Sequence, residues 1–386
     1  MTELRPARYQ INIRPIGPTP LATTTHQSYT NIPFSNLQFE RFINKVGGCR
    51  FDVPLRHPMF MKDASANIHP LYAGYHEVSV VRIPFSGLPQ TVFCGPLVGT
   101  TASSKEQNVN CSCDSLETYF YWMGIDSPVT VSAGTTNTAL ISSLRALYGI
   151  AGTDEPGSIV YTSVVHGTPI AVGTWGKNLY ASDTLTIGDI LDEFVNLNTI
   201  GYDWYVDPHT KNLHFWTPRK NNVIDFVLTE ERIRSWTAQR YGSVYRNNYY
   251  VIGNADYTAT FTETLANRGD WGRRTLLVKD QQLKDSNSVI WFLNAERQKR
   301  QNLVAGGLGP GSPPFQLFMT VDGLHFPYYD TNFFSVGDSI NMRLQDTVFF
   351  NIPNALPFRV VGFQVSVDSE GGETIILYFN DAAEAG

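Results

Sequence analysis

Four cysteines are the residues whose type most readily suggests chemistry, and all of them lie in the first third of the 386-residue chain: Cys49, Cys94, Cys111 and Cys113. Cys111 and Cys113 are two positions apart, so on a strand they share one face. Four thiolates are a usual ligand set for structural zinc. The sequence lacks the C-x-x-C spacing that normally presents them, and cysteine is also among the most often buried residues. We therefore expect four packed core thiols, with no metal and no cofactor.

Three histidines lie close together in the sequence, at His57, His69 and His76, beside Asp63 and Glu77. A metal cluster of imidazoles and carboxylates is conceivable here. The spacing, however, matches neither a helix-face nor a hairpin ligand set. We interpret these histidines as exposed loop residues.

Paired acids could serve glycoside hydrolysis, which needs two carboxylates that face each other across a cleft. The adjacent acids are Asp154 and Glu155, Asp192 and Glu193, and Glu230 and Glu231. Sequence neighbours on a helix or turn do not face each other, so we interpret the pairs as solvated surfaces or helix N-termini. The G-x-S-x-G, P-loop, H-E-x-x-H and dinucleotide-binding motifs are all missing from the sequence. The glycine-rich residues 306–311 have no lysine and are interpreted as a linker. The sequence predicts no enzyme and no catalytic residues.

Tryptophans could stack against sugar rings, and five are candidates: Trp175, Trp204, Trp216, Trp236 and Trp271. Trp204 and Trp216 lie in two segments that we expect to pair as a hairpin. Packing between those strands is the favoured role for both.

Composition narrows the class of protein. Aromatic residues make up 13% of the chain and charged residues 17%, and there are 31 glycines and 22 prolines. Such a chain is too apolar for disorder and favours many short strands. Residues 1–17 do not resemble a signal peptide, and no run of about 18 apolar residues predicts a membrane span. The net charge of −6 argues against general nucleic-acid binding. So few cysteines predict free thiols and assembly in a cytosol.

Residue patterns divide the chain into three parts. Alternation predicts six short strands within residues 1–116. Residues 117–222 mix two predicted helices, 136–148 and 186–196, with a hairpin over 202–217. Thr186 is the expected N-cap of the second helix and Asp189 its partner. Strands return after residue 223, with a predicted helix near 289–305.

These patterns predict a mainly β fold with an α/β insert. We expect a first β-barrel domain at residues 1–116, a mixed insert domain at 117–222, and a second β-barrel domain at 223–386. The net charge alternates in sign, from +3 over residues 1–116 and −6 over 117–228 to +4 over 229–305 and −7 over 306–386. Segments of alternating charge are suited to an assembly in which a positive patch on one subunit contacts a negative patch on the next.

The order of these segments resembles a known family. The segments that carry the resemblance are residues 38–55 (QFERFINKVGGCRFDVPL), 78–83 (VSVVRI), 92–99 (VFCGPLVG), 202–208 (YDWYVDP), 213–215 (LHF), 245–253 (YRNNYYVIG), 337–340 (GDSI) and 359–363 (RVVGF). Their succession is similar to that in the baseplate hubs, or tail-tip hubs, of long-tailed bacteriophages and related gene transfer agents. The match covers about the whole chain as a pattern of segments.

The resemblance implies a structural virion protein of the tail, assembled in the bacterial host cytoplasm. It implies a homotrimer around the tail axis, whose two tube-like barrels per subunit give a six-fold-like ring. The implied partners are the tail tube or distal tail protein ring above, with tail fibre or tip proteins and the tape measure protein. Many tail-tip hubs continue into a receptor-binding or lytic region, and this chain stops soon after Phe379. We expect any such activity to belong to other proteins.

DNA would pass through such a ring without specific binding, as part of its ejection from the particle. Because lysines and arginines that neutralise phosphates strengthen DNA binding, we expect an acidic or neutral axial surface. Candidates for it are Asp322, Asp330, Asp338 and Asp346, whereas Arg297, Lys299 and Arg300 are expected to meet protein partners or to be solvated. Two alternatives remain open, a tail-tip cell-wall hydrolase and a carbohydrate-binding tail module.

Overall fold

The computed structural model describes most of the strand-forming chain. The described residues are 6–16, 28–60, 71–124 except 72, 86 and 103–106, 129–130, 163–167, 178–179, 186–196, 203–240 except 218, 219 and 221, 245–300 except 255, 256, 265–271, 282 and 284, and 315–380 except 324, 325, 327, 330–333 and 345–351. We call residues 1–116 the N-terminal block, 117–222 the insert and 223–386 the C-terminal block.

One thirteen-stranded sheet takes its strands from both blocks. The N-terminal block supplies β1 (Arg8–Pro15), β2 (Tyr29–Ile32), β3 (Ser35–Phe42), β4 (Gly48–Pro54), β5 (His76–Ile83), β6 (Gln90–Ala102) and β7 (Asn108–Asp114). The C-terminal block supplies β13 (Val223–Thr229), β14 (Ile233–Arg240), β18 (Phe315–Asp322), β19 (Ser339–Leu344), β20 (Ile352–Val367) and β21 (Glu373–Asn380). The six strands predicted in the N-terminal block are confirmed, and the mainly β fold with them.

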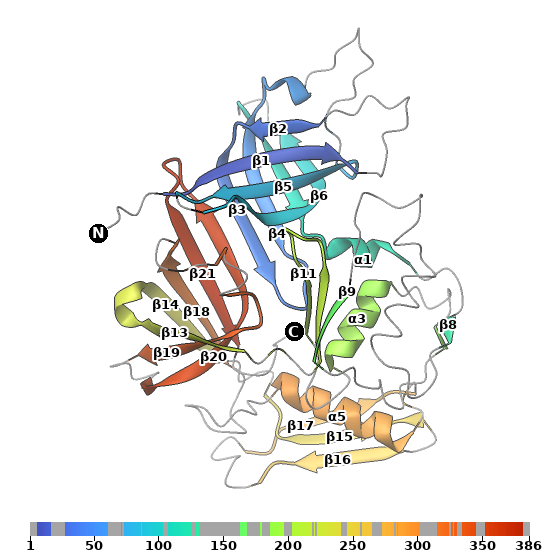
Figure 1. Cartoon of the computed structure of the whole chain (residues 1–386). Coiled ribbons are helices and arrows are strands. Elements are labelled where there is room, and N and C mark those ends of the chain that lie inside the picture. The colour runs from blue at the N-terminus through green and yellow to red at the C-terminus, as the bar shows by residue number, and fades with distance from the viewer. Residues whose placement is uncertain are drawn as a thin grey trace.

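The two blocks join where β3 pairs antiparallel with β20, with Phe39 opposite Val365. Both strands alternate, so Leu37 and Phe39 turn to the same core as Val365 while Gln38 and Glu40 turn away. The strands of the two blocks lie side by side in Figure 1. A single core cluster runs from Ile11 to Phe379 and includes buried side chains from both blocks.

Among the described strands, neither block closes into a barrel, because the ladder runs as an open path from β14 to β2. The described strands therefore do not form the expected pair of separate barrels. They form one sheet that is continuous across the two blocks. The domain boundaries stay a prediction.

The insert is mixed, as the sequence predicts. It contains α1 (Thr118–Trp122), β8 (Val129–Thr130), β9 (Ser163–Gly167), β10 (Asn178–Leu179), α3 (Ile187–Asn196), β11 (Asp203–Val206) and β12 (Leu213–Thr217). β11 and β12 form the predicted hairpin, and β9 pairs with β12 in parallel. The predicted N-cap is also present, since Asp189 N donates to Thr186 Oγ1 at 3.1 Å and Thr186 N donates to Asp189 Oδ2 at 2.7 Å. The predicted helix over 136–148 lies outside the described residues.

A small separate sheet interrupts the C-terminal block. β15 (Asn248–Ile252) pairs with β16 (Thr258–Thr262) and β17 (Thr275–Lys279), and α5 (Ser286–Arg300) packs on one face (Figure 1). This helix corresponds to the insertion predicted near 289–305. Two short 3₁₀ helices, Pro58–Phe60 and Glu230–Arg232, complete the described elements.

Candidate functional site: the junction of the insert with both blocks

A single buried carboxylate ties the insert to both blocks. Asp203 begins β11 and is fully buried, and it pairs with Arg359 of β20. Asn44, in the turn after β3, donates its side-chain amide to Asp203 Oδ1 at 3.0 Å, and the Lys220 backbone donates to Oδ2 at 2.8 Å. Asn44 also accepts from the Trp204 amide at 2.7 Å. Asn44 has φ of 59°, a left-handed conformation that asparagine tolerates well.

Lys220 makes a second tie, from the end of the insert to the C-terminal block. Its ammonium lies 2.8 Å from the buried Asp338 carboxylate and contacts the Ser335 hydroxyl. It also lies 4.7 Å from the centre of the Trp216 ring, a cation–π contact. Burial lowers the pKa of Lys220, and Asp338 opposes that shift. The ammonium therefore holds the turn that precedes β19 against the insert sheet.

Glu77 of β5 makes the third tie, to the turn of the insert hairpin. Its side chain is 2% exposed and accepts from Lys211 Nζ at 2.7 Å and from Arg14 Nε at 2.9 Å. The Cys94 thiol donates to the same oxygen at 3.3 Å. Burial alone would raise the pKa of Glu77, but Lys211 and Arg14 hold it below its usual value. Both partners favour an ionised carboxylate at neutral pH.

Four rings stack on one face of the insert sheet. The rings of Tyr205 and His214 lie 5.1 Å apart, and those of His166 and Trp216 lie 4.5 Å apart, each pair nearly parallel. His166 Nε2 lies 3.0 Å from His214 Nδ1, so one ring donates to the other. Burial lowers the pKa of His214 to about 4, and it lowers the pKa of His166 as well. The guanidinium of Arg41 lies over the Tyr205 ring at 5.4 Å.

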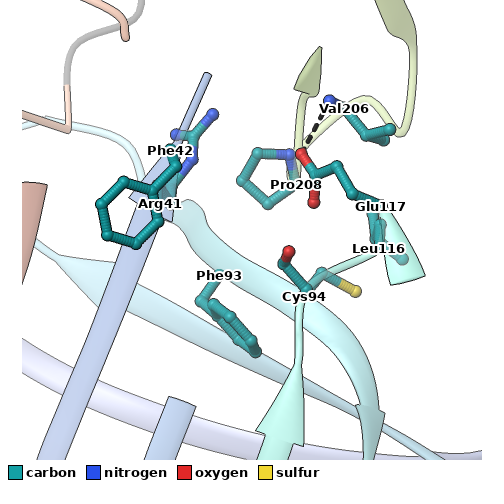
Figure 2. A pocket seen from close by; sticks show the side chains of 9 residues that line it. Arg41, Phe42, Phe93, Cys94, Leu116, Glu117, Val206 and Pro208 are labelled. Carbon is teal, nitrogen blue, oxygen red and sulfur yellow. Dashed lines mark hydrogen bonds between the residues drawn. The ribbon is translucent and has the colours of Figure 1, made fainter. Parts of the chain in front are cut away.

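A small pocket lies where the hairpin meets the N-terminal block (Figure 2). It has a volume of about 10 Å³ and is lined by Arg41, Phe42, Phe93, Cys94, Ser115, Leu116, Glu117, Val206 and Pro208. Glu117 is 5% exposed, and its Oε1 accepts from the Val206 amide at 2.9 Å. The pocket is too small for an organic substrate, so this junction is suited to holding parts of the chain together.

A separate buried cluster links the two blocks directly. Arg82 of β5 donates to both oxygens of Glu373 of β21, at 2.6 and 2.9 Å, and both side chains are at most 5% exposed. Tyr9 and Tyr328 donate to the same carboxylate, and Arg82 lies 3.8 Å from the centre of the Tyr329 ring. Burial raises the pKa values of Tyr9 and Tyr328, which keeps both phenols as donors.

The four cysteines are buried, as predicted, and none forms a disulfide. Cys49 lies opposite Cys113 in the β4–β7 ladder. Burial raises the pKa of each thiol, to about 12 for Cys111, so all four remain protonated at neutral pH. Within the described part of the chain, no three His, Cys, Asp or Glu side chains gather closely enough to hold a metal.

The histidine prediction was wrong for one of its residues. His76 begins β5 and is 1% exposed, because it lies at the start of a strand with both faces covered. His57 accepts weakly from the Met59 amide, at 3.4 Å, and burial lowers its pKa. His69 and Asp63 lie outside the described residues.

The acid pairs do not converge on a cleft. Glu230 and Glu231 are exposed on a 3₁₀ helix, as predicted. Asp192 instead accepts from the Tyr121 hydroxyl at 2.9 Å, which joins α3 to α1. Asp154 and Glu155 lie outside the described residues, as does the side chain of Glu193.

The tryptophan prediction is confirmed for the hairpin. Trp204 is fully buried and meets Phe120 edge to face, and Trp216 belongs to the ring stack. Trp236 of β14 is partly buried against the main core. Trp175 and Trp271 lie outside the described residues.

Several charges expected to face partners or the axis are engaged within the chain. Arg297 lies 3.6 Å from Glu263 and over the Phe261 ring. Asp322 pairs with Arg234 at 2.6 Å, and Asp338 holds Lys220. Asp330, Asp346 and the side chains of Lys299 and Arg300 lie outside the described residues.

A shallow hollow lies on one face of the sheet, over β14, β18 and β21. Its volume is about 310 Å³, and its lining is Ser235, Trp236, Thr237, Phe318, Thr320, Ile376 and Tyr378. Beside it, Phe42 and Tyr378 meet at 5.4 Å across the strand that carries Gly362, where a Cβ would lie 2.2 Å from the Phe42 ring. Gly362 therefore makes room for neighbouring rings on this face.

Among the helices that the structure describes, none has the length and the apolar character of a membrane span. No protein-family model and no curated protein sequence matches the chain.

Solved structures do match it. The 43 kDa tail protein of prophage MuSo2 from Shewanella oneidensis superposes with a TM-score of 0.62 at 12% identity, covering 96% of this chain and 98% of that one. The tail protein from Neisseria meningitidis MC58 gives 0.60 at 12%, covering 97% and 99%. The Francisella PdpA–VgrG complex includes a chain that gives 0.56 at 8%, covering all of this chain and 54% of that one. The resemblance seen in the sequence is thus confirmed at the level of fold: this chain has the fold of phage tail proteins.

Proposed function

We propose that the chain is a structural component of a phage-type tail, at the hub that joins the tail tube to the tip. The observation that carries this proposal is the shared fold over nearly the full length of both chains, 97% and 99% for the Neisseria tail protein. A purely structural role also suits a junction built from buried ion pairs around a pocket too small for a substrate.

The chain would act as a homotrimer around the tail axis. Each subunit would contribute two tube-like units, residues 1–116 and 223–386, which flank the insert at 117–222. In the described strands these units share an open sheet. We propose that their barrels are completed by contacts between subunits in the trimer, which would give a six-fold-like ring.

The ring would form part of the conduit for DNA ejection and would bind the DNA only weakly. Its proposed partners are the tail tube or distal tail ring above and the tip, fibre and tape measure proteins below. The Francisella match involves a chain that occurs in a complex with another protein, which suits a part that works within an assembly. We propose assembly in the host cytoplasm, without catalysis by this chain.

The mass of the purified chain in solution tests the trimer. Light scattering over a range of concentrations is expected to approach three times the subunit mass of 43.2 kDa. A stable monomer or dimer at the highest concentrations, together with no copy in purified particles by mass spectrometry, would contradict the proposal.

The aromatic hollow favours a second candidate function, binding of a neutral sugar. It combines the rings of Phe318 and Tyr378 with the hydroxyls of Ser235, Thr237 and Thr320. The two rings meet edge to face, at 88°, so the proposal is that a sugar ring packs on one of them beside the hydroxyls. Calorimetric titration with host cell-wall fragments tests it, with Tyr378→Ala as the disabled variant and Tyr257→Ala, a change at an exposed ring elsewhere, as the control. Equal heats from both variants would exclude a site here.

A further inference from the structure

The pocket of Figure 2 contains one donor whose hydrogen-bonding capacity is not met. Arg41 extends from β3, between the rings of Tyr205 and Phe363 at 5.4 and 6.0 Å. Its Nη2 atom is buried and has no hydrogen-bond partner among the described residues. Leaving such a donor unpaired costs about 1 to 3 kcal/mol. Buried groups of this kind are commonly satisfied by ordered water.

The pocket also contains an acceptor. Glu117 gives one carboxylate oxygen to the Val206 amide, and Figure 2 shows the second oxygen on the pocket side, between Pro208 and Cys94. Burial raises the pKa of Glu117, while hydrogen bonds from Ser115 and Val206 and the charge of Arg41 limit that rise. The cation and the carboxylate line the same space without a direct hydrogen bond from Arg41 Nη2.

The size of the space decides what fits. A volume of about 10 Å³ is close to the smallest that holds one water. A buried water needs two to four polar partners. Arg41 and Glu117 are such partners, and both line the pocket, whereas the Ser115 hydroxyl already accepts from the Gly47 amide at 2.8 Å.

We propose that one ordered water occupies this pocket and joins the Glu117 carboxylate to the Arg41 guanidinium. The water completes a contact among the three parts of the chain. Arg41 belongs to the N-terminal block and lies against Phe363 of the C-terminal block, and Glu117 holds the backbone of the insert hairpin at Val206. The inference concerns the fold of one subunit and does not depend on the proposed tail function.

A high-resolution crystal structure of the full chain at neutral pH tests the proposal directly. The expected result is one water peak within about 2.7 to 3.1 Å of Arg41 Nη2 and of a Glu117 oxygen. An empty pocket, or a direct hydrogen bond between Arg41 and Glu117, would overturn it.

Variants add a test in solution. Arg41→Met removes the donors, and we expect the water to be lost and the pKa of Glu117 to rise further, because the charge of Arg41 lowers it. Infrared difference spectra of carbon-13 glutamate-labelled protein would show a new protonated carboxyl band. Lys45→Met is the matched control, because Lys45 is a nearby cation that lies over Phe42 and does not line the pocket. The same new band in both variants, or in neither, would count against the bridge.

Discussion

The molecule is held together at two buried polar junctions that differ in kind. Between the blocks, Arg82 and Glu373 form a closed cluster with two tyrosines, Tyr9 and Tyr328, and burial raises the pKa values of both phenols. Between the insert and the blocks, the ion pairs of Asp203 and Lys220 lie beside a pair of stacked histidines. The junction of the insert therefore contains two imidazoles whose pKa values are lowered by burial and which take up protons as the pH falls, whereas the groups named at the junction of the blocks include no imidazole.

The largest effect is expected at the block junction. Arg82→Met leaves the Glu373 carboxylate buried without its cation, and we expect the free energy of unfolding to fall by about 3 to 5 kcal/mol. Chemical denaturation measures this. Arg234→Met is the matched control, since the Arg234 side chain is 54% exposed beside Asp322 and its loss is expected to cost at most about 1 kcal/mol. Equal losses in the two variants would show that the Arg82 cluster adds no special stability.

The second largest loss of stability is expected when the carboxylate at the insert junction is removed. Asp203→Ala leaves Arg359 and the Asn44 amide without their acceptor, and we expect a loss of about 2 to 4 kcal/mol. The loss should concentrate in the insert, so limited proteolysis is expected to cut that region faster while β3 and β20 stay protected. Asp225→Ala, at an exposed residue of β13, serves as the control. A uniform loss of protection over the whole chain would argue against a separate insert junction.

A smaller effect is expected where β3 and β20 pair. Gly362→Ala places a Cβ 2.2 Å from the Phe42 ring and 2.8 Å from the Arg41 carbonyl oxygen. Overpacking of this kind costs about 1 to 3 kcal/mol. Thermal unfolding of this variant should be compared with Gly124→Ala, where the new methyl group meets nothing within 4 Å. Equal melting temperatures for the two variants would show that the pairing of β3 with β20 accommodates the extra methyl group.

The smallest effect is that of pH on the insert. His214 has a folded pKa of about 4, below its usual value near 6.5, so the opened state binds more protons between these limits. Stability of the insert junction is therefore complete above pH 6.5 and is lost as the pH falls toward 4. We expect the free energy that stabilises the insert junction to fall by about 1 to 2 kcal/mol. This is less than the full pKa shift of His214 implies, because the ring is partly exposed.

Hydrogen exchange at pH 7 and pH 4.5, corrected for intrinsic rates, measures this effect. Amides of β11 and β12 should lose protection while those of β20 and β21 keep theirs. His214→Phe retains a ring in the stack and is expected to flatten the pH response. A response unchanged by His214→Phe would assign the acid sensitivity to other groups.

Local elements could be predicted from the sequence because their causes are local. Alternating apolar residues define β1 and β3 to β7, and the Thr186–Asp189 cap sets the start of α3. Strand β2 escaped prediction, because its four residues include one buried side chain, Ile32, and show no clear alternation.

Long-range pairing could not be predicted. Nothing near Arg82 in the sequence indicates Glu373, and the pairing of β3 with β20 depends on the whole core. The burial of His76 likewise follows from the strands packed around it. The junction of the insert with both blocks could not be predicted from the sequence for the same reason. Its aromatic and charged residues are scattered through all three parts of the chain, and folding alone brings them together.

The most direct test of the proposed function is a cryo-electron microscopy reconstruction of the intact particle that contains this chain. We expect three copies around the axis at the tail tip, with residues 1–116 and 223–386 alternating in a six-fold-like ring and an acidic or neutral inner face. Six copies, a place away from the tip, or an inner face dominated by Lys and Arg of residues 229–305 would contradict the account.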